Sequence, residues 1–322
     1  MFIQFLILIF GFILLISGAN ALINGSSGIA KKFNIPEILI GLTIVALGTS
    51  LPELVVTIIS STTGNTDILV GNVIGSNICN LLLILGTVAI LKPLKFEKST
   101  IKQNLPLLIF ITILVLLFGL GLFSSNKLIF IRTHGIILLI FALIYFLYPI
   151  LEYIKSTKSS KKSDTINSYN KENKSFVQCI VYILLGGLAL KYGGDFVVNS
   201  ATTIATMLNI PERVISLTIV ALGTSLPELV TSIVAIIKND DDLAEGNIIG
   251  SCIINFCLIL GLGATLSNIV LTVTYIEDLI WLVCSCILIW LYGIFNKNNT
   301  LTRFNGFILV IIYLVYSLIL FL

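Results

Sequence analysis

The hydrophobic positions of this chain form long unbroken runs rather than the narrow stripes of a water-soluble helix. Each run is about 20 residues long, which is the length that a helix needs to cross a bilayer core roughly 30 Å thick. The period-2 alternation of a membrane barrel strand is absent. We therefore predict an all-α integral membrane protein with ten transmembrane helices, at 2–30, 36–62, 68–91, 104–122, 130–153, 176–207, 211–237, 243–267, 273–295 and 301–321.

Composition agrees with this prediction. Hydrophobic residues make up 57% of the 322 positions and charged residues 11%, and the mean hydropathy is +1.08. A water-soluble domain would need many more polar residues to cover its surface. The six cysteines lie in apolar runs without a CxxC pair, which favours buried membrane side chains over a redox or zinc site. We expect no cofactor, and the lipid bilayer as the surrounding medium.

The second half of the chain repeats the first half at an offset of 175 residues. Residues 41–86 align without gaps to 216–261, with 27 identities in 46 positions. Each half holds five predicted spans, and since five is odd, the second copy must enter the membrane from the opposite side. We therefore divide the chain into a first five-helix repeat at 1–153, a polar linker at 154–175 and a second, inverted five-helix repeat at 176–322.

The basic residues predict the orientation. With the N-terminus outside, the loops that become cytoplasmic hold 15 of the 19 lysine and arginine residues, as the positive-inside rule expects. This distribution predicts a multi-pass protein of the cell membrane with both termini outside and a cytoplasmic linker. The net charge of +3 arises largely in these loops, so it argues for topology and against nucleic-acid binding.

Two acidic residues interrupt the apolar runs near their middle, Glu53 in the second span and Glu228 in the seventh. A charge at mid-bilayer costs about 2.5–3.5 kcal/mol on insertion scales. A protonated glutamic acid bonded to a neighbouring helix would be the purely structural explanation. Because the same residue stands twice between the same flanking residues, we favour a duplicated functional site with helices broken at the membrane midplane.

A proline precedes each glutamate and predicts this break. Pro52 and Pro227 lack an N–H and clash with the carbonyl four residues back. Each helix should therefore unwind near Gly-Thr-Ser, which would leave the carbonyls of 46–49 and 221–224 without partners inside the helix. Unpaired backbone at membrane depth is tolerated only where it faces protein or a wet cavity. Carbonyls, hydroxyls and a carboxylate together form an oxygen site that suits a hard cation.

The third and eighth spans carry a polar stripe that would form the other wall of this site. Its members recur every four residues on one helical face, as Asn72, Ser76 and Asn80 and again as Asn247, Ser251 and Asn255. A GxxxG pattern, Gly71/Gly75 and Gly246/Gly250, accompanies each stripe and lets another helix approach closely. We expect these spans to pack against the broken helices.

An oxygen count favours Ca²⁺ as the cation. Two bidentate glutamates would give about four ligands, and one carbonyl from each break, near Thr49 and Thr224, would make about six. Asn80, Asn255 or water would complete the set of about six to eight that Ca²⁺ prefers, whereas Mg²⁺ demands tight octahedral geometry. Two carboxylates also balance the charge of one Ca²⁺.

Two further charged motifs stand apart from this site. Lys191 and Asp195 lie at i, i+4 in the sixth span, a spacing that permits an ion pair. We favour a structural pair over a transport role. The acidic run at 239–242 lies in a predicted cytoplasmic loop, where we favour a solvated turn over a regulatory Ca²⁺ site.

Together these motifs resemble those of a known family. The segments 48–53 and 223–228, both Gly-Thr-Ser-Leu-Pro-Glu, with 71–80 and 246–255, are similar to the two alpha-repeats of the cation/calcium antiporter superfamily, above all the prokaryotic sodium/calcium exchangers. The motifs cover about 46 residues in each half, and the ten-span layout extends the likeness to nearly the whole chain. The resemblance implies a secondary active antiporter that exchanges Na⁺ for Ca²⁺ by alternating access, electrogenically, at about three Na⁺ per Ca²⁺.

The resemblance also implies which residues bind the ions. Glu53 and Glu228 would hold Ca²⁺ and Na⁺ alternately, while the first and sixth spans slide across the remaining bundle. Oxygens of the flanking residues would line the Na⁺ sites, namely Ala46, Thr49, Ser50, Ser76, Ala221, Thr224, Ser225 and Ser251, with Asn80 and Asn255 completing the site. Two positions depart from the family pattern. Prokaryotic relatives often carry aspartate in place of Asn255, which leaves the pH dependence open, and Cys252 replaces an expected asparagine.

Several alternatives remain open at this point. A Ca²⁺/H⁺ exchanger or a K⁺-dependent Na⁺/Ca²⁺ exchanger would use the same repeats, although the amides of Asn80 and Asn255 cannot titrate, which argues against proton coupling. An intramembrane enzyme could use paired carboxylates as acid and base, but no nucleophile–histidine set or transition-metal ligands accompany them. A passive channel could not concentrate Ca²⁺. We predict a transporter rather than an enzyme, with Ca²⁺ and Na⁺ as partners and no obligate protein partner.

Overall fold

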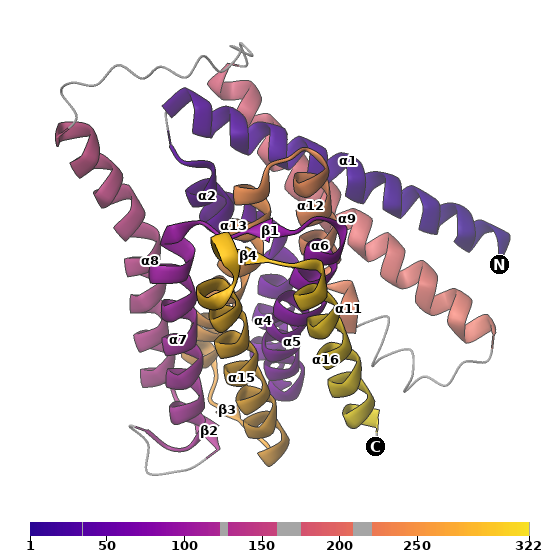
Figure 1. Ribbon diagram of the computed structural model, residues 1–322. Helices are drawn as coiled ribbons and strands as arrows, with labels where there is room; N and C mark the ends of the chain where they lie inside the picture. The colour runs from indigo at the N-terminus through magenta and orange to yellow at the C-terminus, as the bar shows by residue number, and fades with distance from the viewer. Residues whose placement is uncertain (34, 123–127, 160–174, 209–220, 322) are drawn as a thin grey trace.

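A computed structural model describes residues 1–33, 35–122, 128–159, 175–208 and 221–321 of the chain (Figure 1). The first half contains α1 (Phe2–Phe33), α2 (Glu37–Ile40), the π-helical η1 (Gly41–Val45), α3 (Ala46–Thr49), α4 (Leu51–Thr63), α5 (Thr66–Ile78), the π-helical η2 (Cys79–Ile84), α6 (Leu85–Leu91), β1 (Leu94–Lys95), the π-helical η3 (Thr100–Asn104), α7 (Leu105–Gly119), β2 (Ile129–Phe130) and α8 (Arg132–Ser159). The second half contains α9 (Phe176–Met207), α11 (Ala221–Gly223), α12 (Leu226–Ile237), α13 (Asp241–Ile254), the π-helical η5 (Asn255–Leu260), α14 (Gly261–Leu266), β3 (Ile269–Val270), α15 (Val273–Phe295), the 3₁₀-helical η6 (Lys297–Asn299), β4 (Thr300–Leu301) and α16 (Arg303–Phe321).

The helices of the described residues are long and apolar, as a membrane bundle requires. Seven of them could cross a bilayer, and an eighth candidate is the pair Glu37–Thr49 and Leu51–Thr63, which bends by 49° where its halves meet. Two shorter apolar helices, Arg132–Tyr148 and Leu226–Ile237, fall in the two remaining predicted spans. The predicted all-helical membrane architecture is therefore confirmed, whereas the count of ten spans stays a prediction.

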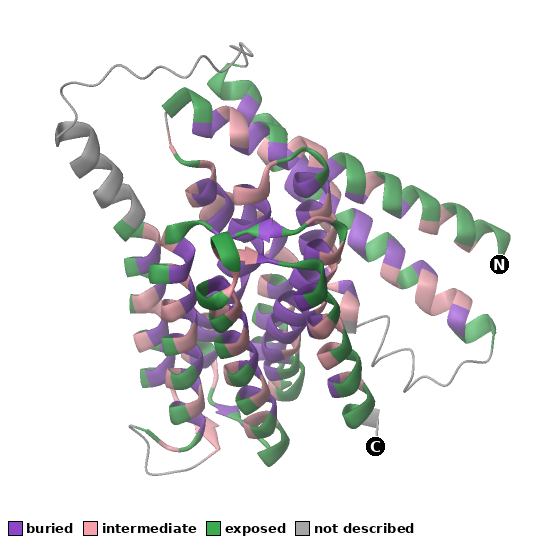
Figure 2. Cartoon of the chain, viewed as in Figure 1, coloured by how far each residue is buried: buried purple, intermediate pink, exposed green. Residues whose placement is uncertain are grey.

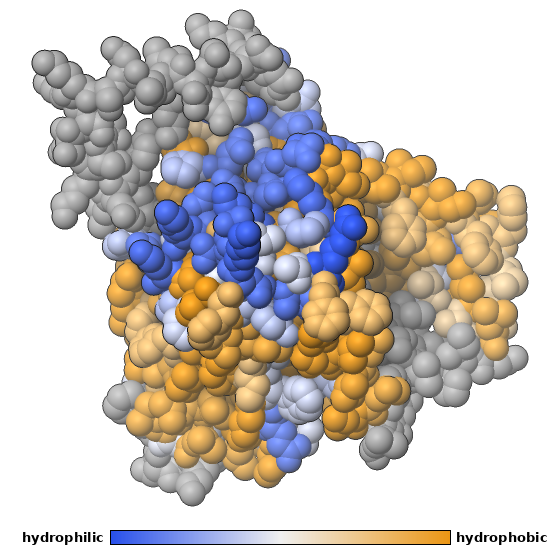
Figure 3. All heavy atoms as spheres, in the orientation of Figure 1, coloured by the Kyte–Doolittle hydropathy of each residue, from blue (hydrophilic) through white to orange (hydrophobic). Residues whose placement is uncertain are grey.

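The outside of the bundle is apolar over much of its height. Large hydrophobic side chains on α1, α8, α9 and α16 are exposed, among them Ile9, Leu143, Leu184 and Leu318 (Figure 2). Figure 3 shows this apolar surface beside a polar end that gathers around β1 and β4. Exposed apolar surface on this scale is unfavourable in water and fits the hydrocarbon of a bilayer.

Helices α1 and α9 lie side by side and touch through a strip of glycines (Figure 1). A Cβ at Gly186 would lie 2.6 Å from the backbone nitrogen of Leu22, and one at Gly193 would lie 2.8 Å from that of Leu15. Backbones approach this closely only where no side chain stands between them. The two helices therefore pack as a pair along one side of the bundle.

Two short antiparallel ribbons join the halves of the chain. β1 pairs with β4, with Leu94 opposite Leu301, and β2 pairs with β3, with Ile129 opposite Val270. The ribbons lie toward opposite ends of the bundle in Figure 1. Each half therefore contributes one strand to each ribbon, which is the arrangement that a twofold axis in the membrane plane would produce.

Candidate cation-binding site

The broken helices place both glutamates in the interior of the bundle. Ser50, at φ −84° and ψ 11°, separates α3 from α4, and Ser225, at φ −88° and ψ 3°, precedes α12. A proline in the first turn of each following helix is well tolerated, because an N–H there has no partner within the helix. Glu53 and Glu228 stand in the same first turns. The positive end of the helix dipole favours a negative charge at this position.

The first break is narrower than the sequence analysis predicted. The Ser50 N–H still donates to the Ala46 carbonyl at 3.0 Å, so the expectation that the carbonyls of 46–49 all lack partners within the helix is wrong. Pro52 removes a single N–H, and Ser50 is the residue that leaves helical geometry between α3 and α4, so the chain bends instead of unwinding. The Ala46 carbonyl also accepts the Ser251 hydroxyl at 3.5 Å. In the second half, the description begins with the backbone of Ala221 at the start of α11.

Both glutamate side chains are fully buried and accept hydrogen bonds from serine hydroxyls. Ser50 donates to Glu228 Oε1 at 2.9 Å, which is a contact between the two halves. Ser76 donates to Glu53 Oε1 at 3.4 Å, and its hydroxyl lies 3.5 Å from that of Thr224. These contacts bring the two carboxyl groups into one interior site, away from the lipid-facing surface.

Helices α5 and α13 form the wall beside the broken helices. Asn72 Nδ2 donates to the Glu53 carbonyl at 3.3 Å, and Asn247 Nδ2 donates to the Glu228 carbonyl at 3.4 Å. Asn247 Oδ1 also accepts the Thr49 hydroxyl at 3.0 Å. The polar stripe therefore hydrogen-bonds each wall helix to the backbone of the glutamate in its own half. Helix α13 also contacts the break of the other half.

The predicted close packing of a wall helix on a broken helix occurs between halves. A Cβ at Gly250 of α13 would lie 2.6 Å from the carbonyl oxygen of Leu42 in η1, and one at Gly246 would lie 2.7 Å from that of Ile38. The matching approach of Gly71 and Gly75 would involve 209–220, which lies outside the described residues.

Each wall helix becomes π-helical where its last polar residue stands. Asn80 lies in η2, and Asn255 is the first residue of η5. Wider π-turns recur at functional sites, and nothing in the amino-acid pattern announced them. Asn255 Nδ2 donates to Asn77 Oδ1 at 3.0 Å. Asn80 instead lies beside the Cys252 thiol, a weak partner, and neither of its amide atoms has a hydrogen bond of ordinary geometry among the described residues.

The predicted site contains several unsatisfied polar atoms. Within the described part of the chain, those without a partner include Glu53 Oε2, Glu228 Oε2, Ser225 Oγ, both amide atoms of Asn80, and Asn255 Oδ1. Buried polar atoms of folded proteins nearly always have partners, so such a group calls for a ligand. Carboxylate, amide and hydroxyl oxygens are the ligands of Ca²⁺ and similar hard cations. The donor set therefore fits a transported cation.

Among the described residues, no group of three or more histidine, cysteine, aspartate or glutamate side chains could hold a metal ion. A cation at this site would therefore rest on two carboxylates and on neutral oxygens. This is a weaker donor set than that of a permanent metal centre, and it suits an ion that must leave again.

A cavity borders the site. It measures about 170 Å³ and extends between α9 and the broken helices, and its walls include Pro52, Gly223 and Thr224. Thr224 is partly exposed, whereas the equivalent Thr49 is fully buried. An ion could therefore approach the glutamates past Thr224.

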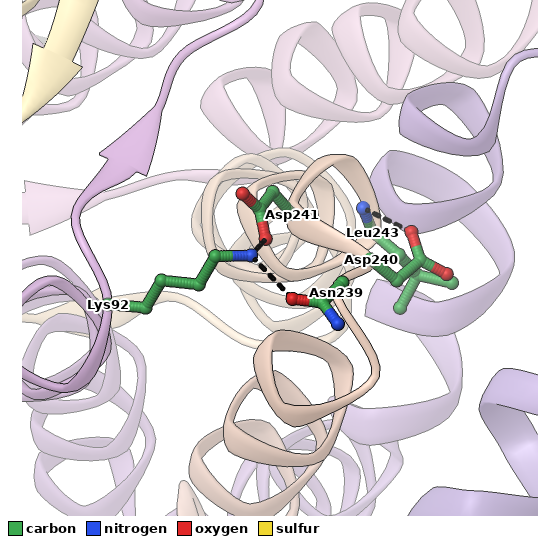
Figure 4. Close-up of polar contacts among 5 residues, drawn as sticks. All are labelled: Lys92, Asn239, Asp240, Asp241 and Leu243. Atoms are coloured by element: carbon green, nitrogen blue, oxygen red, sulfur yellow. Dashed lines mark hydrogen bonds and ion pairs between the residues drawn. The ribbon is translucent and has the colours of Figure 1, made fainter.

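The acidic run at 239–242 forms a structured turn rather than a freely solvated one (Figure 4). Lys92 Nζ lies 2.7 Å from Asp241 Oδ1 and donates to Asn239 Oδ1 at 3.1 Å. Asp240 accepts the Leu243 N–H at 3.3 Å and so caps α13, and it also accepts the Ser27 hydroxyl at 3.2 Å. Burial raises the pKa of Asp240 above its ordinary value.

Glu245 is a buried acid that the sequence analysis missed. Glu245 in α13 is fully buried, and its Oε2 accepts the Glu97 N–H at 3.1 Å, next to the start of η3. It lies within the predicted span at 243–267, and the sequence analysis assigned it no role. The partner that explains it lies 148 positions away in the sequence.

Comparison with known proteins identifies the family. A family model described as "Sodium/calcium exchanger protein" matches residues 3–151 and 179–322. The chain belongs to the sodium/calcium exchanger family. One relative, the sodium/calcium exchanger MaX1 of Methanosarcina acetivorans, is 33% identical over 349 residues, which cover 99% of each chain.

Two further comparisons also extend over most of this chain. The inner membrane protein YrbG of Escherichia coli is 34% identical over 264 residues, which cover 81% of this chain and 79% of YrbG. The solved structure of the sodium-calcium exchanger NCX_Mj, soaked with Na⁺ and Ca²⁺, superposes with a TM-score of 0.81 at 30% identity, covering 97% of both chains. The family and its fold are therefore shared over nearly the whole chain.

Proposed function

We propose that this chain is a secondary active antiporter that exchanges Na⁺ for Ca²⁺ across the cell membrane. One observation carries the proposal: Glu53 and Glu228 are fully buried in one interior site, and each has a carboxyl oxygen without a partner among the described residues. Two buried carboxylates are expensive unless a cation compensates them, and their charge balances that of one Ca²⁺. Membership of the exchanger family supports the same function.

The surrounding oxygens complete the proposed ion sites. The two glutamates hold Ca²⁺ or Na⁺ in turn, with the amides of Asn80 and Asn255 beside them. The remaining oxygens bind Na⁺ in the flanking positions and come from Ala46, Thr49, Ser50, Ser76, Ala221, Thr224, Ser225 and Ser251. The hydrogen bonds among these residues support one shared site for competing cations.

The α1–α9 pair is the proposed moving part. It packs through its own glycine contacts, and it lies beside both breaks, at Gly48 and at Gly223. A shift of this pair would open one approach to the site and close the other, which is how transporters built from inverted repeats alternate access. The repeats are those at 1–153 and 176–322, the linker 154–175 is cytoplasmic, and both termini lie outside.

Ion-replacement transport in liposomes tests the proposal. An outward Na⁺ gradient is expected to drive uptake of radiolabelled Ca²⁺, and Glu53→Gln and Glu228→Gln should each lower it by roughly 100-fold or more, because each removes a buried charge worth several kcal/mol. Glu245→Gln is the matched control, since Glu245 is equally buried but lies outside the site. Near-normal uptake in either site variant would refute the assigned glutamates.

The same liposomes separate the rival transporters. A pH gradient without Na⁺ should move little Ca²⁺ if Na⁺ is the driving ion, and omission of K⁺ should leave uptake unchanged. Exchange of about three Na⁺ for one Ca²⁺ moves one net charge, so an imposed potential should shift the equilibrium by about 2.3 kcal/mol per 100 mV. Robust proton-driven or strictly K⁺-dependent uptake would favour those rivals instead.

A further inference from the structure

The cavity that borders the site at Thr224 is lined by two charged residues. Lys191 and Asp195 of α9 line it together with Thr224, and they carry the charges among the described residues that line it. Lys191 Nζ lies 3.0 Å from Asp195 Oδ2, and the two side chains are 30% and 49% exposed. The ammonium group also lies 4.5 Å from the centre of the Tyr192 ring. We call Lys191 and Asp195 the vestibule pair.

Lys191 lines a cavity beside a proposed cation site, and a positive charge there requires an explanation. An unpaired ammonium beside a narrow, partly apolar cavity would repel Ca²⁺ and lower its local concentration, because low-dielectric walls focus the field. Asp195 cancels this repulsion while the pair is intact. The approach to the glutamates is therefore close to neutral only as long as both residues keep their charges.

The other half lacks such a pair. The repeat offset relates Lys191 to Ile16 and Asp195 to Asn20 in α1, and the Asn20 amide donates to the Ile16 carbonyl at 2.9 Å. In an inverted repeat these residues would line the approach from the opposite side of the membrane. Charge control at the mouth is thus a property of one approach only.

We infer that the Lys191–Asp195 pair controls the electrostatic access of cations to the site from the side on which this cavity opens. This inference rests on the proposed function, because it concerns the same transported ions. It assigns the pair a role in setting the apparent affinity for Ca²⁺ on that side, and no direct contact with the bound ion.

Right-side-out and everted membrane vesicles test the inference, because each exposes one face of every exchanger. Asp195→Asn should raise the KM for Ca²⁺ by about threefold to tenfold on one face only, and Lys191→Gln should lower it by a similar factor on that face. The double variant should return close to the wild-type KM, and kcat should change little. These differences should shrink in about 1 M choline chloride, where the Debye length is about 3 Å.

The ion pair between Lys92 and Asp241 is the control. Lys92→Gln and Asp241→Asn alter a pair of similar distance, 2.7 Å, that does not line the cavity, so they should leave the KM on that face unchanged. Equal shifts on both faces, or shifts of the same sign for Asp195→Asn and Lys191→Gln, would overturn the inference, because a merely structural pair loses function when either partner is removed.

A chemical readout keeps the inference testable without transport. In a Thr224→Cys background, the rates at which a cationic and an anionic methanethiosulfonate modify the introduced thiol are compared by mass spectrometry. Asp195→Asn should favour the anionic reagent and Lys191→Gln the cationic one, each by about threefold. If wild-type vesicles fail to exchange, the proposed function fails alone. If the reagent ratio stays constant, the vestibule inference fails alone.

Discussion

The segments 48–54 and 223–229 have the same sequence and different surroundings. Thr49 in the first is fully buried and donates its hydroxyl to Asn247 at 3.0 Å. Thr224, its equivalent, is partly exposed and lines the cavity. The first threonine is therefore enclosed, and the second borders the cavity.

The cause of this difference lies outside the two segments. A Cβ at Gly48 would meet Leu22 of α1 at 3.6 Å, whereas one at Gly223 would meet the Val198 side chain of α9 much more closely. The repeat offset makes Val197, not Val198, the equivalent of Leu22. The α1–α9 pair thus meets the two breaks in different registers. An exchanger with two equivalent breaks is asymmetric in this way whenever its site faces only one side of the membrane.

The largest expected effect comes from breaking the contact inside the α1–α9 pair. In Gly186→Ala the new methyl group would lie 2.6 Å from the Leu22 nitrogen and 2.8 Å from the Gly18 carbonyl oxygen, and backbone atoms cannot yield as a side chain can. We expect exchange to fall by roughly 100-fold and the thermal unfolding temperature to drop, since overpacking costs about 1–3 kcal/mol. Transport and a thermal melt in detergent measure both.

The neighbouring glycine supplies the control. Gly187→Ala would place its methyl group 3.9 Å from a Leu51 methyl, an ordinary contact, so exchange and stability should stay near wild type. If both variants behaved alike, the close approach of α1 and α9 would not be the feature that matters.

The difference between the two breaks can be measured directly by thiol labelling. The new thiol of Thr224→Cys should react with a small water-soluble reagent about tenfold or more faster than that of Thr49→Cys, because only Thr224 lines the cavity. Conditions that favour the opposite state should reverse the order. Labelling is read by mass spectrometry. Similar rates in every condition would mean that the two breaks are not alternately sealed.

The smallest expected effect concerns the two amides. Asn255 is held by Asn77, whereas Asn80 faces Cys252 and keeps its amide atoms unpaired among the described residues. Cys252→Asn would offer Asn80 the partner that Asn255 already has. A cation would then have to displace a hydrogen bond worth about 1 kcal/mol, so the KM for Ca²⁺ should rise about fivefold.

Cys252→Ala is the matched control for this substitution, because it removes the thiol without adding a hydrogen-bonding group. The KM of this variant should stay within about twofold of wild type. A fivefold rise in Cys252→Ala as well would point to packing around the thiol rather than to the freedom of Asn80.

The sequence predicted the parts of this structure that depend on local pattern and duplication. The apolar runs predicted the helical membrane architecture, and the repeated Pro-Glu pairs predicted interior glutamates beside bent helices. Register along a helix was enough to predict that Asn72, Ser76 and their copies would reach the broken helices, because residues four apart share a face.

What the sequence could not show depends on contacts between distant segments. The π-turns at Asn80 and Asn255 have no compositional sign, since they arise from packing rather than propensity. Pro52 suggested a wider break than exists, because the Ser50 N–H keeps its helical bond. The different exposure of Thr49 and Thr224 could not be foreseen, since two equal sequences differ only through the segments that pack against them.

The exchange of strands between the halves bears on how the protein is made. When β1 and β2 leave the ribosome, their partners at 300–301 and 269–270 have not been synthesised. The first half therefore stays in the membrane with unpaired strand edges until the second half has been made. Unpaired strand edges can pair with the wrong partner. A chain cut within 160–174 should consequently assemble only when both pieces are produced in the same cell.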